Sequence, residues 1–158
     1  MRYWLFKTEP SEYSWERLLR EGKTAWSGVR SFQARNNMME MKLGDLGFFY
    51  HSSIAVPQIA GIVKVIREAF PDSTAWDKKS DYYDPRSTEK KPLWQMVEVA
   101  PEADIARPVT LAEMRAEPRL AYMPLLQKGQ RLSVQPVSPQ EWETILLLAR
   151  APETHSAR

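Results

Sequence analysis

The sequence has no cysteine among its 158 residues, and only two histidines and six glycines. Without cysteine it can form no disulfide framework, thiolate nucleophile or cysteine-based zinc site. His51 and His155 stand far apart, and no cluster of His, Asp and Glu has the spacing of metal ligands, so we expect no metal and no cofactor. Phosphate-loop and dinucleotide-binding glycine patterns are also missing.

Long apolar runs are missing too, since no segment approaches the roughly 20 residues that cross a bilayer. The first six residues lead directly into Lys7, Glu9 and Pro10, a pattern that does not predict a signal peptide. We therefore expect no membrane partner and a cytoplasmic location, or a nuclear one in a eukaryote. The net charge of +2 is too small to indicate sequence-independent binding to nucleic acid, so such binding would need a pocket with a local basic rim.

The amino-acid composition is typical of a globular domain, with 43% hydrophobic and 27% charged residues. No internal repeat interrupts it, and no Pro-, Gly- or Ser-rich linker divides it. We expect one domain over residues 1–150, a flexible tail over residues 151–158 and a monomer.

Helix-capping residues predict four short helices. Ser14 is an expected N-cap with Gly22 as the stop, and Ser31 caps a second helix. Capping boxes begin at Thr110 and Ser138, the latter followed by a proline at the first helical position.

Segments rich in β-branched and aromatic residues predict strands over residues 2–8, 45–52, 58–67, 93–99 and 131–135. The second and third are expected to form an antiparallel pair. The long polar stretch 71–92 predicts a loop that is functional or disordered. Together these elements indicate the α+β class, as a curved, mostly antiparallel sheet or open barrel with short helices around it.

A candidate ligand pocket lies at residues 26–37. Trp26 falls between two expected helices, where it could stack on a planar ligand, and Gly28 would let the backbone approach that ligand. Arg30 precedes a helix N-terminus, which favours anions. Asn36 and Asn37, with Gln33, carry amides that can read a base edge. The competing interpretation makes Trp26 a core residue, Gly28 a turn and Arg30 a solvated charge, and spacing alone does not decide between the two.

Two other groups could contribute polar contacts. Tyr50, His51 and Ser52 end an expected strand, but strand neighbours point to opposite faces, so a Ser–His nucleophilic site is disfavoured. Lys7 and Glu9 leave the first strand together and could reach a pocket rim, as an acid–base pair or as a surface ion pair.

An ordered set of segments resembles the EVE domain family of the PUA-like superfamily, from residue 3 to about residue 149. The matching stretches are residues 3–10, 26–30, 33–37, 44–52, 60–63, 80–87 and 92–94. The resemblance implies a PUA-like open, mostly antiparallel β-barrel with flanking short helices. It also implies a non-catalytic module that recognises a modified nucleobase in DNA or RNA. The implied pocket is related to that of YTH domains, which read methylated adenine. It is comparable in use to that of SRA domains, which read methylated cytosine.

The resemblance also implies roles for particular residues. Trp26 is similar to the first wall of an aromatic cage, with Trp94 or Trp76 as a second wall, and Asn36 or Asn37 to the amide that reads the base edge. The complete set of expected ligand-binding residues is Lys7, Glu9, Trp26, Ser27, Gly28, Val29, Arg30, Asn36, Asn37, Tyr50, His51, Ser52 (the last three as a polar floor), and Tyr82, Tyr83, Asp84, Pro85 (as a lid).

Two alternatives stay open. Some PUA-like relatives of the ASCH type are similar to nucleoside amidohydrolases that use a Lys, a Thr and a Glu, and Lys7, Thr8 and Glu9 are present here. The chain could also be a pure protein-interaction module whose aromatic residues all belong to the core.

Overall fold

The computed structural model describes residues 1–152, so most of the expected tail lies outside the described residues. Within the described part, six strands form one sheet in the order β2-β5-β4-β3-β1-β6. The strands are β1 (Tyr3–Thr8), β2 (Thr24–Ala25), β3 (Leu46–His51), β4 (Gln58–Pro71), β5 (Gln95–Thr110) and β6 (Val134–Val137). The helices are α1 (Trp15–Glu21), α2 (Phe32–Glu40), α3 (Leu111–Ala116) and α4 (Pro139–Arg150), with 3-10 turns η1 (Ser73–Trp76), η2 (Pro118–Leu120) and η3 (Pro124–Leu126).

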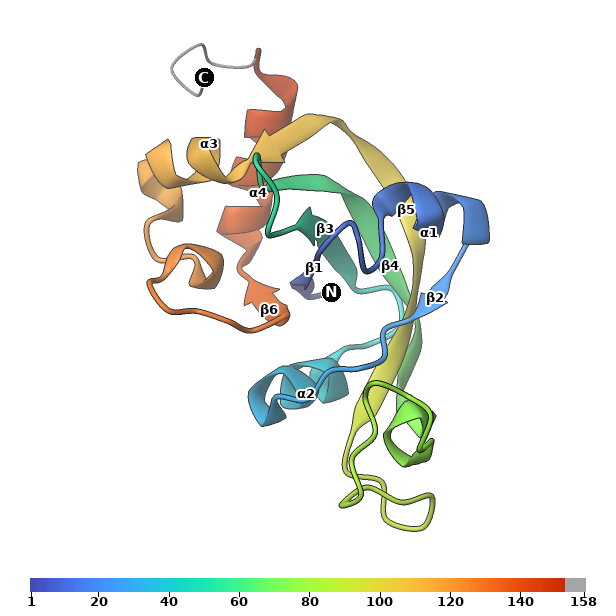
Figure 1. Ribbon diagram of the computed structural model, residues 1–158. Coiled ribbons are helices and arrows are strands. Elements are labelled where there is room, and N and C mark those ends of the chain that lie inside the picture. The colour runs from blue at the N-terminus through green and yellow to red at the C-terminus, as the bar shows by residue number, and fades with distance from the viewer. Residues whose placement is uncertain (153–158) are drawn as a thin grey trace.

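The sheet is open and mostly antiparallel, as predicted. β1 and β3 run parallel, whereas β1–β6, β2–β5, β3–β4 and β4–β5 are antiparallel. Several register shifts interrupt the β4–β5 ladder, and bulges of this kind bend strands. The two long strands accordingly curve through the whole height of the molecule (Figure 1).

All four predicted helix starts are confirmed. The Ser14 and Ser31 hydroxyls accept hydrogen bonds from the amides of Arg17 and Ala34, and both capping boxes are complete. Gly22 ends α1 in the left-handed conformation, with φ of 80°.

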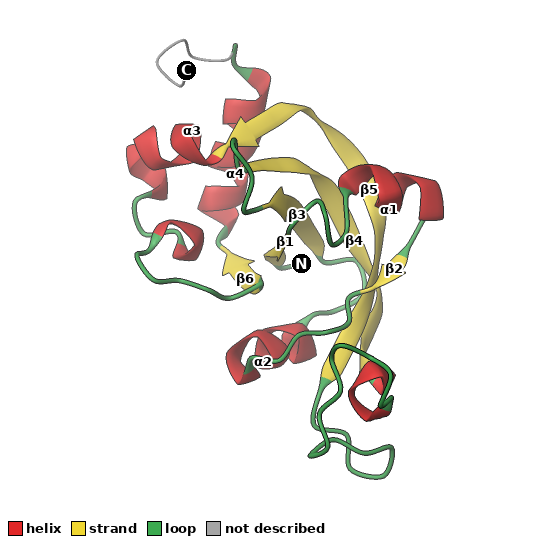
Figure 2. Ribbon diagram, in the orientation of Figure 1, coloured by secondary structure: helices red, strands yellow, loops and turns green. Residues whose placement is uncertain are grey.

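The alternation of β1 and β3 separates two apolar clusters on opposite faces of the sheet. Trp4, Phe6 and Phe49 belong to a cluster with side chains of α1 and α2, whereas Leu5 and Phe48 belong to one with side chains of α3 and α4. Figure 2 shows α3 and α4 on one side of the strands, with α1 and α2 set apart from them. β1 and β3 end side by side, with Thr8 paired opposite His51, so the polar residues at these two positions lie together at one end of the sheet.

Some strand boundaries differ from the prediction. β5 continues from the expected end near residue 99 to Thr110, because pairing with β4 satisfies its backbone although its outer side chains are charged and exposed. The last strand covers Val134–Val137 rather than residues 131–135, and Pro136 is tolerated there because β6 is an edge strand. β2, only two residues long, was not predicted.

Candidate functional site

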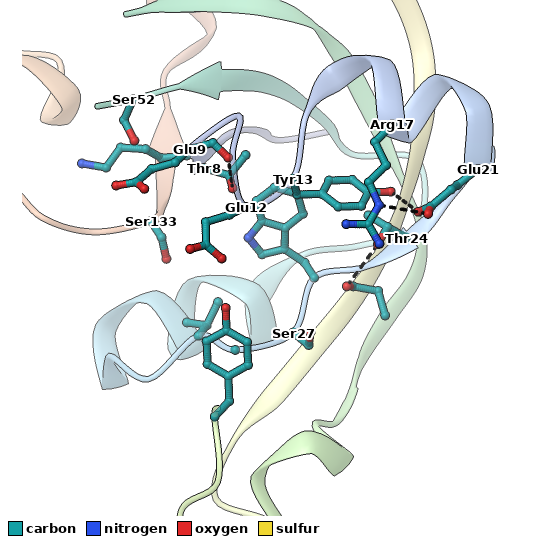
Figure 3. A pocket seen from close by; sticks show the side chains of 16 residues that line it. Thr8, Glu9, Glu12, Tyr13, Arg17, Glu21, Thr24, Ser27, Ser52 and Ser133 are labelled. Carbon is teal, nitrogen blue, oxygen red and sulfur yellow. Dashed lines mark hydrogen bonds and ion pairs between the residues drawn. The ribbon is translucent and has the colours of Figure 1, made fainter. Parts of the chain in front are cut away.

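A cavity of about 490 Å³ opens between the end of β1, helix α1 and the segment that precedes α2. This volume is that of a small-molecule site. Its lining residues are Lys7, Thr8, Glu9, Glu12, Tyr13, Arg17, Glu21, Thr24, Ala25, Trp26, Ser27, Gly28, Val29, Ser52, Tyr82 and Ser133. Figure 3 shows Ser52, Glu9 and Ser133 at one end and Arg17, Glu21 and Thr24 at the other, with Glu12 between them.

Trp26 forms a wall of this cavity and is at the same time a core residue. Its side chain is buried, and its ring meets those of Phe6 and Phe49 edge-on at centroid distances of 5.2 and 5.8 Å. Its backbone amide donates to the Val97 carbonyl, which fixes it against β5. The indole is therefore held rigidly, and only a small part of it faces the cavity.

Tyr82 is a further aromatic residue in the lining of the cavity. It comes from the long loop after β4, is 41% exposed, and lies against Gly28. Gly28 has φ of +83°, and a Cβ at this position would lie 2.8 Å from the Tyr82 ring. The glycine is thus required both by its backbone conformation and by the close approach of the tyrosine.

Arg30 holds this arrangement together from outside the cavity. Its guanidinium donates to the carbonyls of Tyr82 and Val29, the Asp72 carboxylate and the Thr74 hydroxyl, which uses all five of its N–H groups. Such a side chain has no donor left for an anion, although its place before a helix N-terminus suggested one.

Asp72 is the buried partner in this network. It is fully buried and also accepts hydrogen bonds from the amides of Gly28 and Thr74. Burial alone would raise the pKa of Asp72, but the hydrogen bonds from Thr74, Gly28 and Arg30 outweigh it and hold the pKa below its ordinary value. The carboxylate therefore stays ionised and ties the Trp26–Arg30 segment to the loop that carries Tyr82.

The charged lining of the cavity has a slight acidic excess, with three glutamates against Lys7 and Arg17. At one end Glu21 accepts hydrogen bonds from Tyr13, at 2.6 Å, and from Arg17, at 3.1 Å, and these lower the pKa of Glu21. The side chains of Glu9 and Glu12 make no hydrogen bond or ion pair within residues 1–152. Two carboxylates are thus left to accept hydrogen bonds from a ligand.

Eight of the expected ligand-binding residues meet at this cavity: Lys7, Glu9, Trp26, Ser27, Gly28, Val29, Ser52 and Tyr82. Burial, followed by the nearby charge of Arg131, lowers the pKa of Lys7. The expected amide readers lie elsewhere. Asn37 donates to the Val134 carbonyl and so joins α2 to β6, and Asn36 is exposed and accepts from Arg35.

The expected polar floor is divided. Ser52, just after β3, lines the cavity, whereas Tyr50 belongs to the apolar cluster of α3 and α4. His51 lies beneath α1, where its Nε2 accepts from the Trp15 amide. Burial lowers the pKa of His51, against a smaller opposite effect of the Thr8 backbone.

The rest of the expected lid surrounds Tyr82 without lining the cavity. Tyr83 and Pro85 are exposed, and Asp84 accepts from Arg86 and from the Trp94 indole. Trp94 is buried beneath Phe32, and Trp76 lies outside the lining as well. Tyr13 and Tyr82 are the aromatic residues that accompany Trp26 around the cavity.

The sequence analysis did not select Arg17 and Glu21 of α1, nor Tyr13 just before its N-cap, nor Glu12, Thr24, Ala25 and Ser133. A signal was present for α1: Arg17 and Glu21 are four residues apart, so they share one helix face, where a cation and an anion can pair.

Comparison with known proteins identifies the family. The sequence model of the EVE domain matches residues 2–148. The chain belongs to the EVE domain family. It is 39% identical to human thymocyte nuclear protein 1 over 165 residues, covering 92% of this chain and 73% of the relative.

Solved structures of the family superimpose closely. A Pseudomonas putida protein is 46% identical, with a TM-score of 0.90 over 93% of this chain and 99% of its own. The human THYN1 protein, solved in complex with DNA that contains 5-methylcytosine, is 37% identical, with a TM-score of 0.92 over 97% of this chain and all of its own. The YTH domain of Zygosaccharomyces rouxii MRB1 shares the fold at 13% identity and a TM-score of 0.56, covering 98% of this chain and 90% of its own.

Among residues 1–152, no group of three or more His, Asp or Glu side chains is placed to hold a metal ion. No helix in this part of the chain has the length and apolarity needed to cross a membrane.

Proposed function

We propose that this EVE domain binds a single modified nucleobase, displaced from a DNA or RNA strand, in the cavity between Trp26 and Tyr82, and that it does so without catalysis. The observation that carries the proposal is the cavity itself, an open hollow whose lining includes the aromatic residues Tyr13, Trp26 and Tyr82 and two unpaired carboxylates. The structure of the human THYN1 protein with 5-methylcytosine DNA supports it, since that relative shares the fold over its full length.

In this proposal the aromatic side chains select for the methyl group and the polar side chains select the base. A methyl group adds apolar surface, so a dry aromatic slot favours a methylated base over its parent. That preference is limited to about 1–3 kcal/mol per methyl group. Base identity must therefore come from hydrogen bonds to the base edge.

Glu9 and Glu12 are the groups that we assign to this readout. A carboxylate only accepts hydrogen bonds, so it selects bases that present an exocyclic amino group, such as cytosine and adenine, over thymine or uracil. Lys7, at the same end of the cavity, adds a donor for a ring nitrogen or carbonyl oxygen. This assignment replaces the asparagine readers expected from the sequence, neither of which lines the cavity.

Displacing a base from a helix costs a few kcal/mol, so single-stranded substrates should bind more tightly than paired ones.

We also propose that residues 1–150 form a single domain that acts as a monomer, in the cytoplasm of a bacterium or the nucleus of a eukaryote.

The amidohydrolase alternative has one observation in its favour, namely that Lys7, Thr8 and Glu9 all line the cavity. Their side chains are not arranged for catalysis, however. Within the described residues no hydrogen bond joins Lys7 to Thr8, whose hydroxyl instead donates to the Glu9 backbone carbonyl at 3.4 Å. A nucleophile requires a base within hydrogen-bond reach. Incubation with N4-acetylcytidine, followed by chromatography, tests this alternative, and turnover that depends on Lys7 would support it.

The binding proposal is tested by calorimetric titration with nucleosides: 5-methyldeoxycytidine, N6-methyladenosine and their unmethylated parents. Tyr82→Ala is the decisive variant, because Tyr82 is partly exposed and its loss should leave the fold intact. Trp26→Ala is less suitable, since removing a buried tryptophan costs about 3–5 kcal/mol of stability.

We expect one methylated nucleoside to bind more tightly than its parent, and Tyr82→Ala to weaken it at least about fivefold, because stacking contributes about 1–3 kcal/mol per base. Tyr122→Ala is the matched control, since Tyr122 is 92% exposed and lies outside the cavity. Absence of binding by every nucleoside, or equal losses in the two variants, would refute the proposal.

A further inference from the structure

A second cavity of about 500 Å³ adjoins the first and shares Lys7 and Ser52 with it. It lies on the other face of β1 and β3, where Tyr50 is paired in register with Lys7. The far wall is formed by α3 and by the chain that follows η3, which provide Arg115 and Lys128. Lys7 and Ser52 thus line both cavities and lie at the boundary between them.

The charges of the two cavities differ. The first has three glutamates against Lys7 and Arg17 in its lining, whereas the second contains Lys7, Arg115 and Lys128 and no acidic residue. Arg131 adds a further positive charge nearby, since it contributes to lowering the pKa of Lys7. An anion is therefore favoured in the second cavity over the first.

The cations of the second cavity are also unpaired. Within residues 1–152 the side chains of Lys7, Arg115 and Lys128 make no hydrogen bond or ion pair. Their neighbours differ: Arg119 is paired with Glu117, and Arg107 with Glu113. Three unpaired cations around one hollow repel one another, and an anion between them would remove that repulsion.

A tyrosine adds an unpaired hydroxyl to the same cavity. Tyr50 is only 3% exposed, lines the cavity, and its hydroxyl makes no hydrogen bond within the described part of the chain. Burial raises the pKa of Tyr50 to about 12, against the opposing effect of Arg115, so the hydroxyl keeps its proton at neutral pH. With the Ser52 hydroxyl, it gives the cavity neutral donors beside its cations.

We propose that this second cavity, formed by Lys7, Tyr50, Ser52, Arg115 and Lys128, binds the phosphate groups that flank the recognised base in its strand. The inference rests on the proposed function and extends it, because it defines the path of the sugar–phosphate backbone. The base enters the first cavity, and the strand bends across Lys7 and Ser52 so that its phosphates reach the basic second cavity. The ligand is then a nucleic-acid strand and not a free nucleoside.

The test compares three ligands that carry the best-bound modified base: the nucleoside, its 5′-monophosphate and a single-stranded pentanucleotide. Each is titrated against the wild type, Arg115→Ala, Lys128→Ala and the double variant at several salt concentrations. Arg115 and Lys128 are exposed and lie outside the first cavity, so these changes should preserve both the fold and nucleoside binding. Lys42→Ala is the matched control: Lys42 is an exposed cation that precedes β3, and roughly 20 Å of strand separates it from Ser52.

We expect the double variant to bind the nucleoside like the wild type but the pentanucleotide about tenfold more weakly at low salt, with a salt slope that is smaller by about 1.4. Lys42→Ala should change neither quantity. Unchanged pentanucleotide affinity and slope in the double variant would overturn the inference while leaving the base-binding proposal intact. A monophosphate that gains as much affinity as the pentanucleotide would overturn the assignment to a strand, and failure of every ligand to bind the wild type would overturn both proposals.

Discussion

The guanidinium of Arg30 donates two hydrogen bonds to the backbone carbonyl of Tyr82, from Nε at 3.0 Å and from Nη2 at 2.8 Å. These bonds join the segment before α2 to a loop residue that lies 52 positions later. Gly28 meets the ring of the same tyrosine, so the position of Tyr82 is fixed through both its backbone and its ring. A lid that is already ordered in the free protein saves the ligand the entropic cost of ordering it.

The first prediction concerns this support. Arg30→Lys keeps the positive charge but cannot reproduce five hydrogen bonds, and it leaves Asp72 with a poorer partner in a buried position. We expect a loss of about 2–3 kcal/mol in the free energy of unfolding and a weaker affinity for the base.

Chemical denaturation and nucleoside titration measure the two effects. Arg86→Lys provides the comparison, because Arg86 forms an exposed ion pair with Asp84 in the same loop. If Arg30→Lys affects stability and affinity no more than Arg86→Lys does, Arg30 does not hold the lid.

The second prediction separates backbone strain from crowding at Gly28. Gly28→Ala and Gly44→Ala both place a side chain at positive φ, +83° and +87°, which costs about 1–2 kcal/mol in either case. Only at Gly28 would the new Cβ collide with a ring, whereas Gly44 has no neighbouring atom within 4 Å. Gly44→Ala should therefore lose stability alone, and Gly28→Ala should also lose at least tenfold in nucleoside affinity. Equal affinities of the two variants would show that Tyr82 does not act at the cavity.

Local rules predicted much of the fold. Capping by Ser14, Ser31, Thr110 and Ser138 is a property of four or five consecutive residues, so the sequence displays it directly. The extension of β5 to Thr110 is not local, because the charged residues of that part are tolerated only through pairing with β4. Sequence patterns contain no information of this kind until the partner strand is known.

The site was predictable where it depended on one segment. Trp26 and Gly28 were selected from a short stretch between two helices, and both line the cavity. The roles of Arg30 and Asn37 were not predictable, because Arg30 binds Asp72 and Tyr82, and Asn37 binds Val134, all far away in sequence. A polar side chain next to a pocket residue has no fixed direction until its tertiary partners are known.

The third prediction tests the carboxylate readout. Glu12→Gln keeps the size of the side chain but replaces a charged acceptor with a neutral amide, which weakens a hydrogen bond from a base amino group. We expect the affinity for 5-methyldeoxycytidine to fall about fivefold and that for thymidine to rise or stay constant, since an amide can also donate to a carbonyl. Glu16→Gln, an exposed change on α1 outside the cavity, is the control. A parallel loss for both nucleosides in Glu12→Gln would contradict an edge-reading role.

The fourth prediction concerns pH. Burial beneath α1 lowers the pKa of His51 from its ordinary value of 6.5, so the folded protein holds the neutral imidazole whose Nε2 accepts from Trp15. The unfolded chain takes up a proton near the ordinary value and the folded one resists it. The stabilising contribution of His51 is therefore complete above about pH 6.5 and is lost as the pH falls through the lowered value.

Chemical denaturation between pH 7.5 and 5, with the titration of the histidine ring protons followed by NMR, measures this effect. Buried carboxylates such as Asp45 and Asp72 do not obscure it, because their pKa values are lowered and they titrate at more acidic pH. His51→Gln retains an acceptor but not the titration, so its unfolding free energy should vary less over this range than that of the wild type. His155→Gln removes the one other histidine and should leave the pH dependence unchanged. A ring titration of His51 at or above pH 6.5 would show that the folded state does not favour the neutral imidazole.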